Sequence, residues 1–554
     1  MSNSIVLSIL AGLLLALALA NTSAAEIDTE RLVETVKVLA SDEFEGRAPG
    51  GPGEAKTIAY LTSRFAELGL VPGGKDGSWT QAVPLHHTQI QGLPKLAFRY
   101  GDREELLAQS IHIEVSTVQP IEHLQIEAAP VVFVGFGVSA PERDWDDFGD
   151  IDLTGKVAVF LVNDPDFAAA QDEAVAGRFG AKRMTYYGRW TYKFEEATRR
   201  GAIAALVIHE DQAAGYGWNV ASSSPGENYS IVPSEDALAP LALQGWLQGE
   251  AAAQLFVGAG LDLAEQRRLA RSPKFRAFEL QHVSFSADLK VNVERIESQN
   301  LLALLPGTTH PEETIMVSSH WDAYGQGEPD AMGRTVRPGA NDDALGTAGV
   351  VELARVFKSS APMARSVVFA VWTAEESGLL GSAAYAANPI YPMATTVANF
   401  TLDILQTAGL ARDVILIGEG QSDLEDDLRR AAAAQGRVLT PESLPENGLF
   451  FRADHFSMAR QGVPVLLLMG IAGGADLIDG GRAAGDQWIK DYIGHCYHQT
   501  CDVWSPAWDL RGAAQDIALY QLIIEDLGNS RRWPQWRSGS EFKAIRAITA
   551  GRRL

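Results

Sequence analysis

Acidic and histidine residues recur in five short motifs in the second half of this 554-residue chain. Together the motifs offer imidazole nitrogens and carboxylate oxygens, the donor atoms that hold zinc in catalytic sites. Two histidines, two aspartates and a glutamate are candidate metal ligands, and a second glutamate is left over. The motifs are His320-Trp321-Asp322, Gly339-Ala340-Asn341-Asp342-Asp343, Ala374-Glu375-Glu376-Ser377-Gly378, Thr401-Leu402-Asp403 and Tyr497-His498.

This donor set is large enough for two metal ions. Two ions about 3.5–4 Å apart can clamp the attacking and leaving oxygens of a hydrolytic reaction. Their mutual repulsion requires a bridging carboxylate, and we expect Asp342 to be that bridge. His320 and Asp403 would then hold one ion, and Glu376 and His498 the other. The sequence therefore predicts a two-metal hydrolytic centre.

Two further carboxylates have predicted roles beside the ligands. Glu375 is adjacent to Glu376, so one side chain can face a metal while the other faces the bridging water. A base within one hydrogen bond of that water can take its proton, and Glu375 is the predicted general base. Asp322 lies two residues after His320, where it can accept a hydrogen bond from the second imidazole nitrogen and orient the ring.

The segments before these motifs predict how they are positioned. Short apolar runs at 314–319, 366–372, 397–402 and 463–469 suit strands that are buried on both faces of a sheet. Helix-like stretches at 346–358 and 381–387 separate some of them. Alternating strands and helices predict an α/β fold with a mixed, mostly parallel sheet flanked by helices. Ligands at the carboxyl ends of its strands would share one edge of the sheet.

These motifs resemble those of peptidase family M28, the co-catalytic zinc peptidases. The matching stretches include His320–Asp322, Gly339–Gly346, Glu375–Gly381, Ala453-Asp454-His455 and Tyr497-His498. The resemblance implies two zinc ions per chain, the ligand set and general base named above, and a role for Tyr497 in steadying the oxyanion. Members often carry Ser where this chain has Ala453, a departure that touches no predicted ligand.

The resemblance covers two blocks, about residues 28–115 and 297–530, and the first block includes the matching stretches Ser41–Arg47 and Gly51–Leu70. Between the two blocks lies a segment that resembles a protease-associated (PA) domain, with its marks at 131–137, 153–160 and 193–209. The predicted organisation is a signal peptide at 1–25, a first peptidase part at 26–115, an inserted β-rich PA-like domain at 116–296 and a second peptidase part at 297–554.

The expected function is that of an exported metallo-aminopeptidase acting on peptides. A carboxypeptidase or dipeptidase on the same scaffold is an alternative, because Arg334, Arg337 and Arg452 flank the motifs and are candidates to grip a substrate carboxylate. A non-catalytic receptor-like relative is a second alternative. The retained ligand set and Glu375 argue against it. The sequence does not determine the side-chain preference or the oligomeric state.

Composition limits the partners and the compartment. The net charge of −24 argues against nucleic acid, which requires a basic surface. Apolar residues from Ile5 to Ala20, followed by small residues, predict a secretory signal peptide and a periplasmic or secreted protein. No later stretch is apolar for the roughly 20 residues that a membrane span requires.

Cys496 and Cys501 are the two cysteines of the chain, and they bracket His498. In an oxidising compartment they can form a disulfide that stiffens the loop. Two unpaired thiols are the alternative. His455 is expected to play a structural part, and His495 to be a neighbour of the site.

Overall fold

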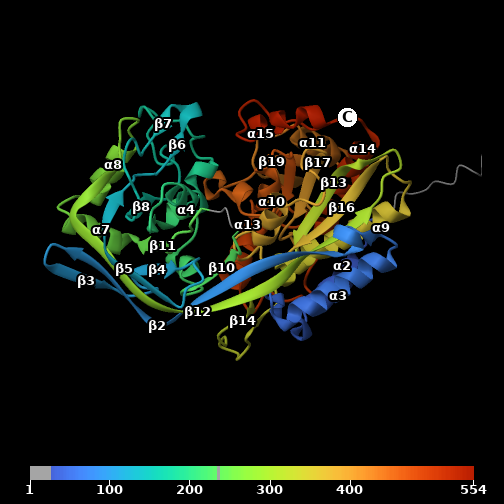
Figure 1. Cartoon of the computed structure of the whole chain (residues 1–554). Coiled ribbons are helices and arrows are strands. Elements are labelled where there is room, and N and C mark those ends of the chain that lie inside the picture. Colours follow the sequence, from blue (N-terminus) through green and yellow to red (C-terminus); the bar gives the residue numbers. More distant parts are fainter. Residues whose placement is uncertain (1–25, 234–237, 554) are drawn as a thin grey trace, which may run out of the picture.

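The computed structural model describes residues 26–233 and 238–553, and these form two lobes joined by a pair of long strands (Figure 1). β12 (Phe278–Leu305) runs beneath both lobes and pairs antiparallel with β2 (Thr80–Tyr100). The predicted signal peptide at 1–25 lies outside the described residues. Among the helices of the described ranges, none has the length and hydropathy needed to cross a membrane.

The first lobe is built on a mixed sheet that continues from one end of β12. Its order is β20–β17–β13–β16–β12, with β20, β17, β13 and β16 parallel and β12 antiparallel to β16. The parallel strands are buried along most of their length, which explains their continuous apolar runs. They are β13 (His310–His320), β16 (Arg365–Trp372), β17 (Thr396–Leu402) and β20 (Val465–Leu468).

Helices cover both faces of this sheet and close two apolar cores. One core is shared with α2 (Thr29–Leu39), α3 (Pro52–Glu67), α9 (Leu345–Ser359), α11 (Leu424–Ala434) and α14 (Arg511–Asn529). The other is shared with α10 (Leu380–Ala387) and α12 (His455–Ala459). The remaining elements of this lobe are β1 (Val71–Pro72), β14 (Gly325–Gln326), β15 (Val336–Arg337), β18 (Asp413–Leu416), β19 (Val438–Pro441), α13 (Gly481–Asp491) and α15 (Lys543–Ile548).

The predicted fold class is confirmed: the chain has a mixed α/β fold with a mostly parallel central sheet and flanking helices. The four predicted strands correspond to β13, β16, β17 and β20, and the two predicted helices to α9 and α10. Boundaries differ by a few residues, because polar residues such as His310–Glu313 extend a strand beyond its apolar run.

The second lobe carries a smaller sheet of its own on the other end of β12. Here β5, β8, β9 and β11 are parallel neighbours, while β4 and β12 flank them antiparallel. The strands are β3 (Arg103–Leu107), β4 (Ile113–Ser116), β5 (His123–Phe133), β6 (Ser139–Ala140), β7 (Trp145–Asp146), β8 (Val157–Leu161), β9 (Ala204–His209), β10 (Glu227–Ile231) and β11 (Leu243–Gln248). The helices are α4 (Trp190–Arg199), α5 (Asp211–Ala214), α6 (Trp218–Ala221), α7 (Gly249–Gly258) and α8 (Leu263–Ala270).

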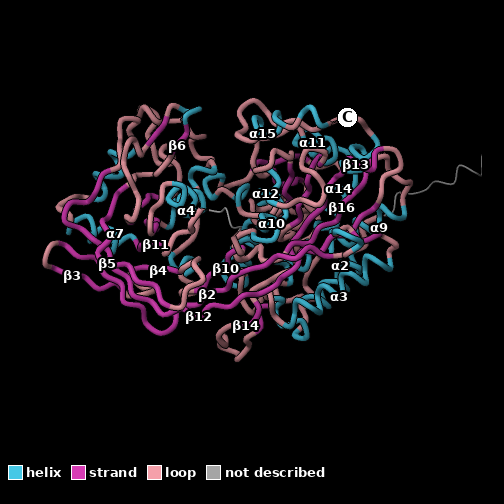
Figure 2. Tube along the Cα trace, viewed as in Figure 1, coloured by secondary structure: helices cyan, strands magenta, loops and turns pink. Residues whose placement is uncertain are grey.

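The lobes have separate apolar cores but share backbone. Residues of β8, β9 and α7 pack in the cores of the second lobe, away from those of β13 and β16. The continuous magenta trace of β2 and β12 in Figure 2 shows that the two long strands run from one lobe to the other. The predicted boundary between residues 296 and 297 therefore lies inside β12.

Candidate metal centre

Three predicted site residues lie at the carboxyl ends of neighbouring parallel strands. His320 is the last residue of β13, Glu375 follows β16 by three residues, and Asp403 directly follows β17. Because β13 pairs in parallel with both β16 and β17, these ends meet at one edge of the sheet. Asp342 comes from the turn before α9, and His498 from the loop that follows α13.

The structure brings all five predicted ligands together around the Asp342 carboxylate. Its Oδ1 lies 3.3 Å from His320 Nε2, and its Oδ2 lies 3.2 Å from His498 Nε2. Asp403 Oδ1 lies 3.9 Å from His320 Nε2, and Glu376 Oε2 lies 3.4 Å from His498 Nε2. Each oxygen of Asp342 thus faces one histidine, and each of these histidines lies near one further carboxylate.

Buried donor atoms without partners test whether this cluster suits metal ions. Four donor atoms are buried and have no hydrogen-bond partner among the described residues: His320 Nε2, His498 Nε2, Glu376 Oε1 and Asp403 Oδ1. Buried polar atoms are normally satisfied. Imidazole nitrogen and carboxylate oxygen are also the atoms that zinc binds. The donor set therefore fits the predicted zinc ions.

The pKa shifts of the clustered carboxyl groups also favour a site for cations. Burial, together with neighbouring carboxylates, raises the pKa of Glu375 and Glu376 well above the usual range. Burial likewise raises the pKa of Asp403 to about 7, with Asp342 contributing. Burial alone would raise the pKa of Asp342 as well, but its contacts with His320 and His498 hold it below its usual value. Cations placed among these carboxylates would offset their mutual repulsion.

Asp343 is a second acidic side chain within reach of His320 and Asp403. Its oxygens are occupied by backbone donors: Oδ1 accepts from Gly346 N at 2.9 Å, and Oδ2 accepts from His320 N at 3.4 Å. Asp343 thus ties α9 to the end of β13. Its neighbour Asp342 faces the two histidines, which favours Asp342 as the ligand.

Asp322 has more contacts than the sequence predicted. Its Oδ1 lies 3.6 Å from His320 Nδ1, on the side expected for an orienting carboxylate. The same nitrogen lies nearer to the backbone oxygen of Asp322, at 3.1 Å. The Asp322 carboxylate also accepts hydrogen bonds from the backbone N–H groups of Glu375 (3.0 Å) and Glu376 (3.4 Å). One buried side chain therefore links the predicted base to the first histidine.

Aromatic rings surround His498. The rings of Tyr497 and Tyr324 lie 3.6 and 4.4 Å from its ring, measured between centroids. Both tyrosines line the cavity that contains the cluster, which has a volume of about 450 Å³. Burial and nearby Asp342 raise the pKa of Tyr497 well above its usual range, so its hydroxyl is a hydrogen-bond donor at neutral pH. Tyr324 was not predicted from the sequence.

Two buried residues that the sequence reasoning missed hold the backbone of the site. Asp502 accepts a hydrogen bond from Asn341 N at its Oδ1 and another from Asp342 N at its Oδ2, both at 3.1 Å. Arg47 donates to the backbone oxygens of Trp321 (2.6 Å) and Gly339 (3.0 Å). Arg47 ends the Ser41–Arg47 stretch that resembles the family, but no local pattern marks its role, and nothing in the local sequence singles out Asp502.

The two other histidines and the two cysteines noted in the sequence have partners outside the predicted ligand set. His455 is fully buried and packs edge-on against Phe450, and burial lowers its pKa to about 3, so the ring is neutral. His495 contacts the backbone oxygen of Asp491. Cys496 and Cys501 form a disulfide, which excludes thiolate ligation and closes the loop around His498.

Comparison with known proteins connects this cluster to a family. Residues 300–522 match the model of Peptidase family M28. A probable zinc metalloprotease of Pyricularia oryzae is 40% identical over 89 residues, which are 16% of this chain and 17% of that protein. Aminopeptidase Y of Saccharomyces cerevisiae is 26% identical over 226 residues, or 39% of this chain and 37% of the yeast protein.

The matched stretches therefore span well under half of these relatives. A solved structure, an aminopeptidase from Aneurinibacillus sp. strain AM-1, aligns with a TM-score of 0.49 and 20% identity, covering 91% of this chain and 95% of that one. The family match and the named relatives indicate a hydrolase and support an M28-type zinc peptidase.

Proposed function

We propose that the chain is an exported metallo-aminopeptidase that holds two zinc ions and removes N-terminal residues from peptides. The observation that carries the proposal is the position of the Asp342 carboxylate, within 3.3 Å of His320 Nε2 and 3.2 Å of His498 Nε2 through different oxygens. A carboxylate shared in this way suits a pair of metals. The M28 match and the name of the yeast relative supply peptide hydrolysis as the reaction.

Zinc bound at this cluster would supply Lewis acidity, polarising the scissile carbonyl and making the attacking water more acidic. Glu375 lines the same cavity, with its Oε2 3.9 Å from His320 Nε2. From that position Glu375 removes a proton from the attacking water and then delivers it to the leaving amine. Asp322 keeps Glu375 in place through its hydrogen bond to the Glu375 backbone.

The remaining residues of the cavity bind and orient the substrate. The Tyr497 hydroxyl donates a hydrogen bond toward the oxyanion that forms at the scissile carbonyl. The carboxylates around the cluster attract a positively charged N-terminal amine, which favours exopeptidase action from that end. Peptides are thus the proposed substrates, and nucleic acid is not expected to bind because the chain is acidic.

The organisation along the chain is part of the proposal. We assign residues 1–25 to a signal peptide, which implies a periplasmic or secreted protein. Most of the second lobe would be a PA-like domain inserted at 116–296 between two peptidase parts, 26–115 and 297–554, although β3 and nearly all of β4 precede residue 116. Its support is the predicted helix and strand at 193–209, which correspond to α4 and β9.

The first test is hydrolysis of aminoacyl-p-nitroanilides by the zinc-loaded protein, with each substrate compared to its N-acetylated form. We expect cleavage of the free-amine compounds alone, because the acetylated forms lack the charged amine. Equal cleavage of both forms would rule out an aminopeptidase. No cleavage of either form, with zinc bound, would favour the carboxypeptidase or dipeptidase alternative.

The second test addresses the base. We expect Glu375→Gln to retain its zinc content while kcat falls by about 10²- to 10⁴-fold, the usual contribution of a general base. The exposed Glu419 provides a matched control, and Glu419→Gln should keep both zinc and activity. Near-normal activity of Glu375→Gln would remove Glu375 from this role. A protein that binds zinc but has no hydrolytic activity would favour the receptor-like alternative.

A further inference from the structure

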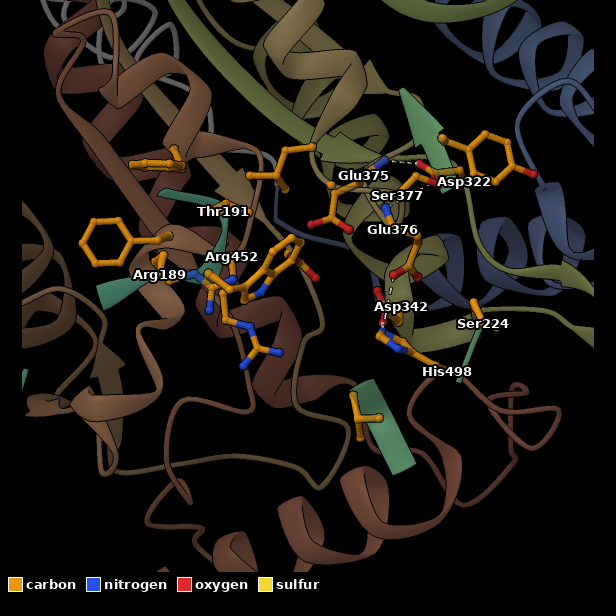
Figure 3. A pocket seen from close by; sticks show the side chains of 18 of the residues that line it. Arg189, Thr191, Ser224, Asp322, Asp342, Glu375, Glu376, Ser377, Arg452 and His498 are labelled. Carbon is orange, nitrogen blue, oxygen red and sulfur yellow. Dashed lines mark hydrogen bonds and ion pairs between the residues drawn. The ribbon is translucent and has the colours of Figure 1, made fainter. Parts of the chain in front are cut away.

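The cavity that contains the metal cluster has a second wall with a different character. Residues of the second lobe, including Arg189 and Trp190 next to α4, line it together with Arg452 of the first lobe. Figure 3 shows Arg189 and Arg452 side by side, across the cavity from Glu375, Asp342 and His498. An acidic cluster and a basic pair thus share one cavity of about 450 Å³.

Arg189 is a buried cation without a carboxylate partner. Its exposed fraction is 6%, and its Nε has no hydrogen-bond partner within residues 26–233 and 238–553. Among the residues that the structure describes, no carboxylate lies within ion-pair distance of it. Burial and the nearby charge of Arg452 lower the pKa of Arg189 to about 10, which still leaves it charged at neutral pH. An unpaired buried charge is costly, so an anion that binds there would be stabilised.

Arg452 has no carboxylate partner either within the described ranges. Its guanidinium lies over the ring of Tyr216, 5.6 Å from the centroid. A third arginine on the same cavity behaves differently. Arg460 is neutralised by Glu195, with Nη1 and Nη2 3.0 and 3.2 Å from the two carboxylate oxygens. The positive charge at this wall is therefore concentrated on Arg189 and Arg452.

The start of α4 adds to this positive potential. Arg189 is its N-cap residue, makes no side-chain capping bond, and is followed by no acidic residue in the first turn. Trp190 and Thr191, the first residues of the helix, also line the cavity. A helix N-terminus carries partial positive charge and exposed N–H groups that favour anions. Its effect adds to that of two guanidinium groups, which match the geometry of a carboxylate.

We propose that Arg189 and Arg452 form a subsite for a carboxylate on the leaving side of the scissile bond. This inference rests on the proposed aminopeptidase function, since it assumes that the N-terminal amine binds at the metal cluster. The carboxylate belongs either to the C-terminus of a very short peptide or to an acidic side chain next to the cleaved bond. The favoured substrates are therefore dipeptides, or peptides with Asp or Glu in the second position.

Three substrates separate the sources of the carboxylate: Leu-Gly, Leu-Gly-amide and Leu-Asp-amide. We expect kcat/KM for Leu-Gly to exceed that for Leu-Gly-amide by about 10- to 100-fold, the usual contribution of a hydrogen bond to a charged group. A kcat/KM for Leu-Asp-amide equal to that for Leu-Gly would show that an acidic side chain can occupy the subsite. A preference for Leu-Asp-amide alone would assign it to acidic side chains. Equal values for all three substrates would overturn the proposal.

Variants then test the two arginines. Arg189→Gln and Arg452→Gln should each bring the ratio between the carboxylate and amide substrates close to one, whereas Arg189→Lys should retain part of it. Arg460→Gln is the matched control, because Arg460 is already paired with Glu195, and it should keep the ratio. If Arg189→Gln fails to fold, Arg452→Gln still decides. A ratio that persists in Arg452→Gln would overturn the subsite.

The two proposals fail in different ways. Leucine p-nitroanilide has no carboxylate, so its cleavage by the wild-type protein reports the aminopeptidase reaction alone. If the wild-type protein does not cleave leucine p-nitroanilide, the proposed function is refuted. Cleavage of the anilide combined with equal rates on Leu-Gly and Leu-Gly-amide would refute only the carboxylate subsite.

Discussion

At the scale of single residues, the site depends on side chains that hold backbone as much as on the predicted ligands. Asp502 is the clearest case, because its buried carboxylate accepts hydrogen bonds from Asn341 N, Asp342 N and the Tyr492 hydroxyl. It thereby joins the turn that carries Asp342, the proposed bridging ligand, to the loop that carries His498. Groups that orient metal ligands in this way commonly affect metal affinity strongly.

We therefore expect Asp502→Asn to weaken zinc binding by about 10- to 100-fold, the usual effect of losing such a supporting contact. An asparagine amide replaces one acceptor oxygen with a donor that faces backbone N–H groups. Competition with a graded series of chelators measures the change. Asp509→Asn is the matched control, since Asp509 pairs with Arg511 away from the cluster. Wild-type zinc affinity in Asp502→Asn would show that the carboxylate does not position the site.

The candidate ligands could be proposed from sequence because each follows a short apolar run or lies in a local motif. Arg47 and Asp502 could not be found in this way. Arg47 reaches Trp321 and Gly339, which are 274 and 292 residues away along the chain. Asp502 contacts backbone N–H groups 160 and 161 residues away. No local pattern marks a side chain whose partners are backbone atoms of a distant segment.

At the scale of elements, the loop after α13 differs from the strands that present the candidate ligands His320 and Asp403. His320 and Asp403 are fixed by paired strands, but His498 has a left-handed backbone conformation, with φ of 62°, in a loop closed by the Cys496–Cys501 disulfide. A disulfide restricts the unbound conformations of such a loop. Binding an ion through His498 then costs less conformational entropy.

The double variant Cys496→Ser/Cys501→Ser should consequently lower the affinity for one zinc ion more than the affinity for the other. The ion bound by Glu376 and His498 should lose roughly tenfold in affinity, within the stabilisation that a short disulfide loop provides. Zinc content per chain, measured across a chelator series, should fall from two to one before it reaches zero. Parallel loss of both ions, or no loss at all, would contradict a stiffening role for the disulfide.

Strands and helices of the first lobe could also be predicted, because a strand buried on both faces is apolar throughout. β12 could not be predicted because it is not apolar throughout. Its middle alternates between buried and exposed residues as it passes between the lobes, and it has 28 residues. Most strands are far shorter, so a pattern of this length does not identify one element.

At the scale of the whole molecule, the cavity is made by both lobes, whereas all the predicted metal ligands belong to the first. Its lining runs from Ala48 to His498 and includes Arg189 and Tyr229 of the second lobe. The arrangement of the lobes along β2 and β12 brings these residues together. Arg189 therefore had no predicted role, and only its place opposite the metal cluster suggests one.

Because all the predicted ligands belong to the first lobe, zinc removal should lower the stability of that lobe. An ion that binds only the folded state stabilises it by about 4 kcal/mol when free zinc is about 1,000 times its Kd. For a lobe of roughly 300 residues, about 1 kcal/mol corresponds to about 1.5 °C in Tm, so two such ions, about 8 kcal/mol together, correspond to about 12 °C. We expect chelation to lower the Tm of the first lobe by about 12 °C. Added zinc should restore it.

Hydrogen exchange can locate this effect. Amides of β13, β16 and β17 should exchange faster after chelation, because these strands end next to the proposed zinc site. Amides of β8 and β9 should keep their rates, since these strands belong to a separate core. The double variant Asp403→Ala/His498→Ala should show no response to zinc. A response in that variant, or one shared equally by β8 and β9, would mean that zinc stabilises the protein at another place.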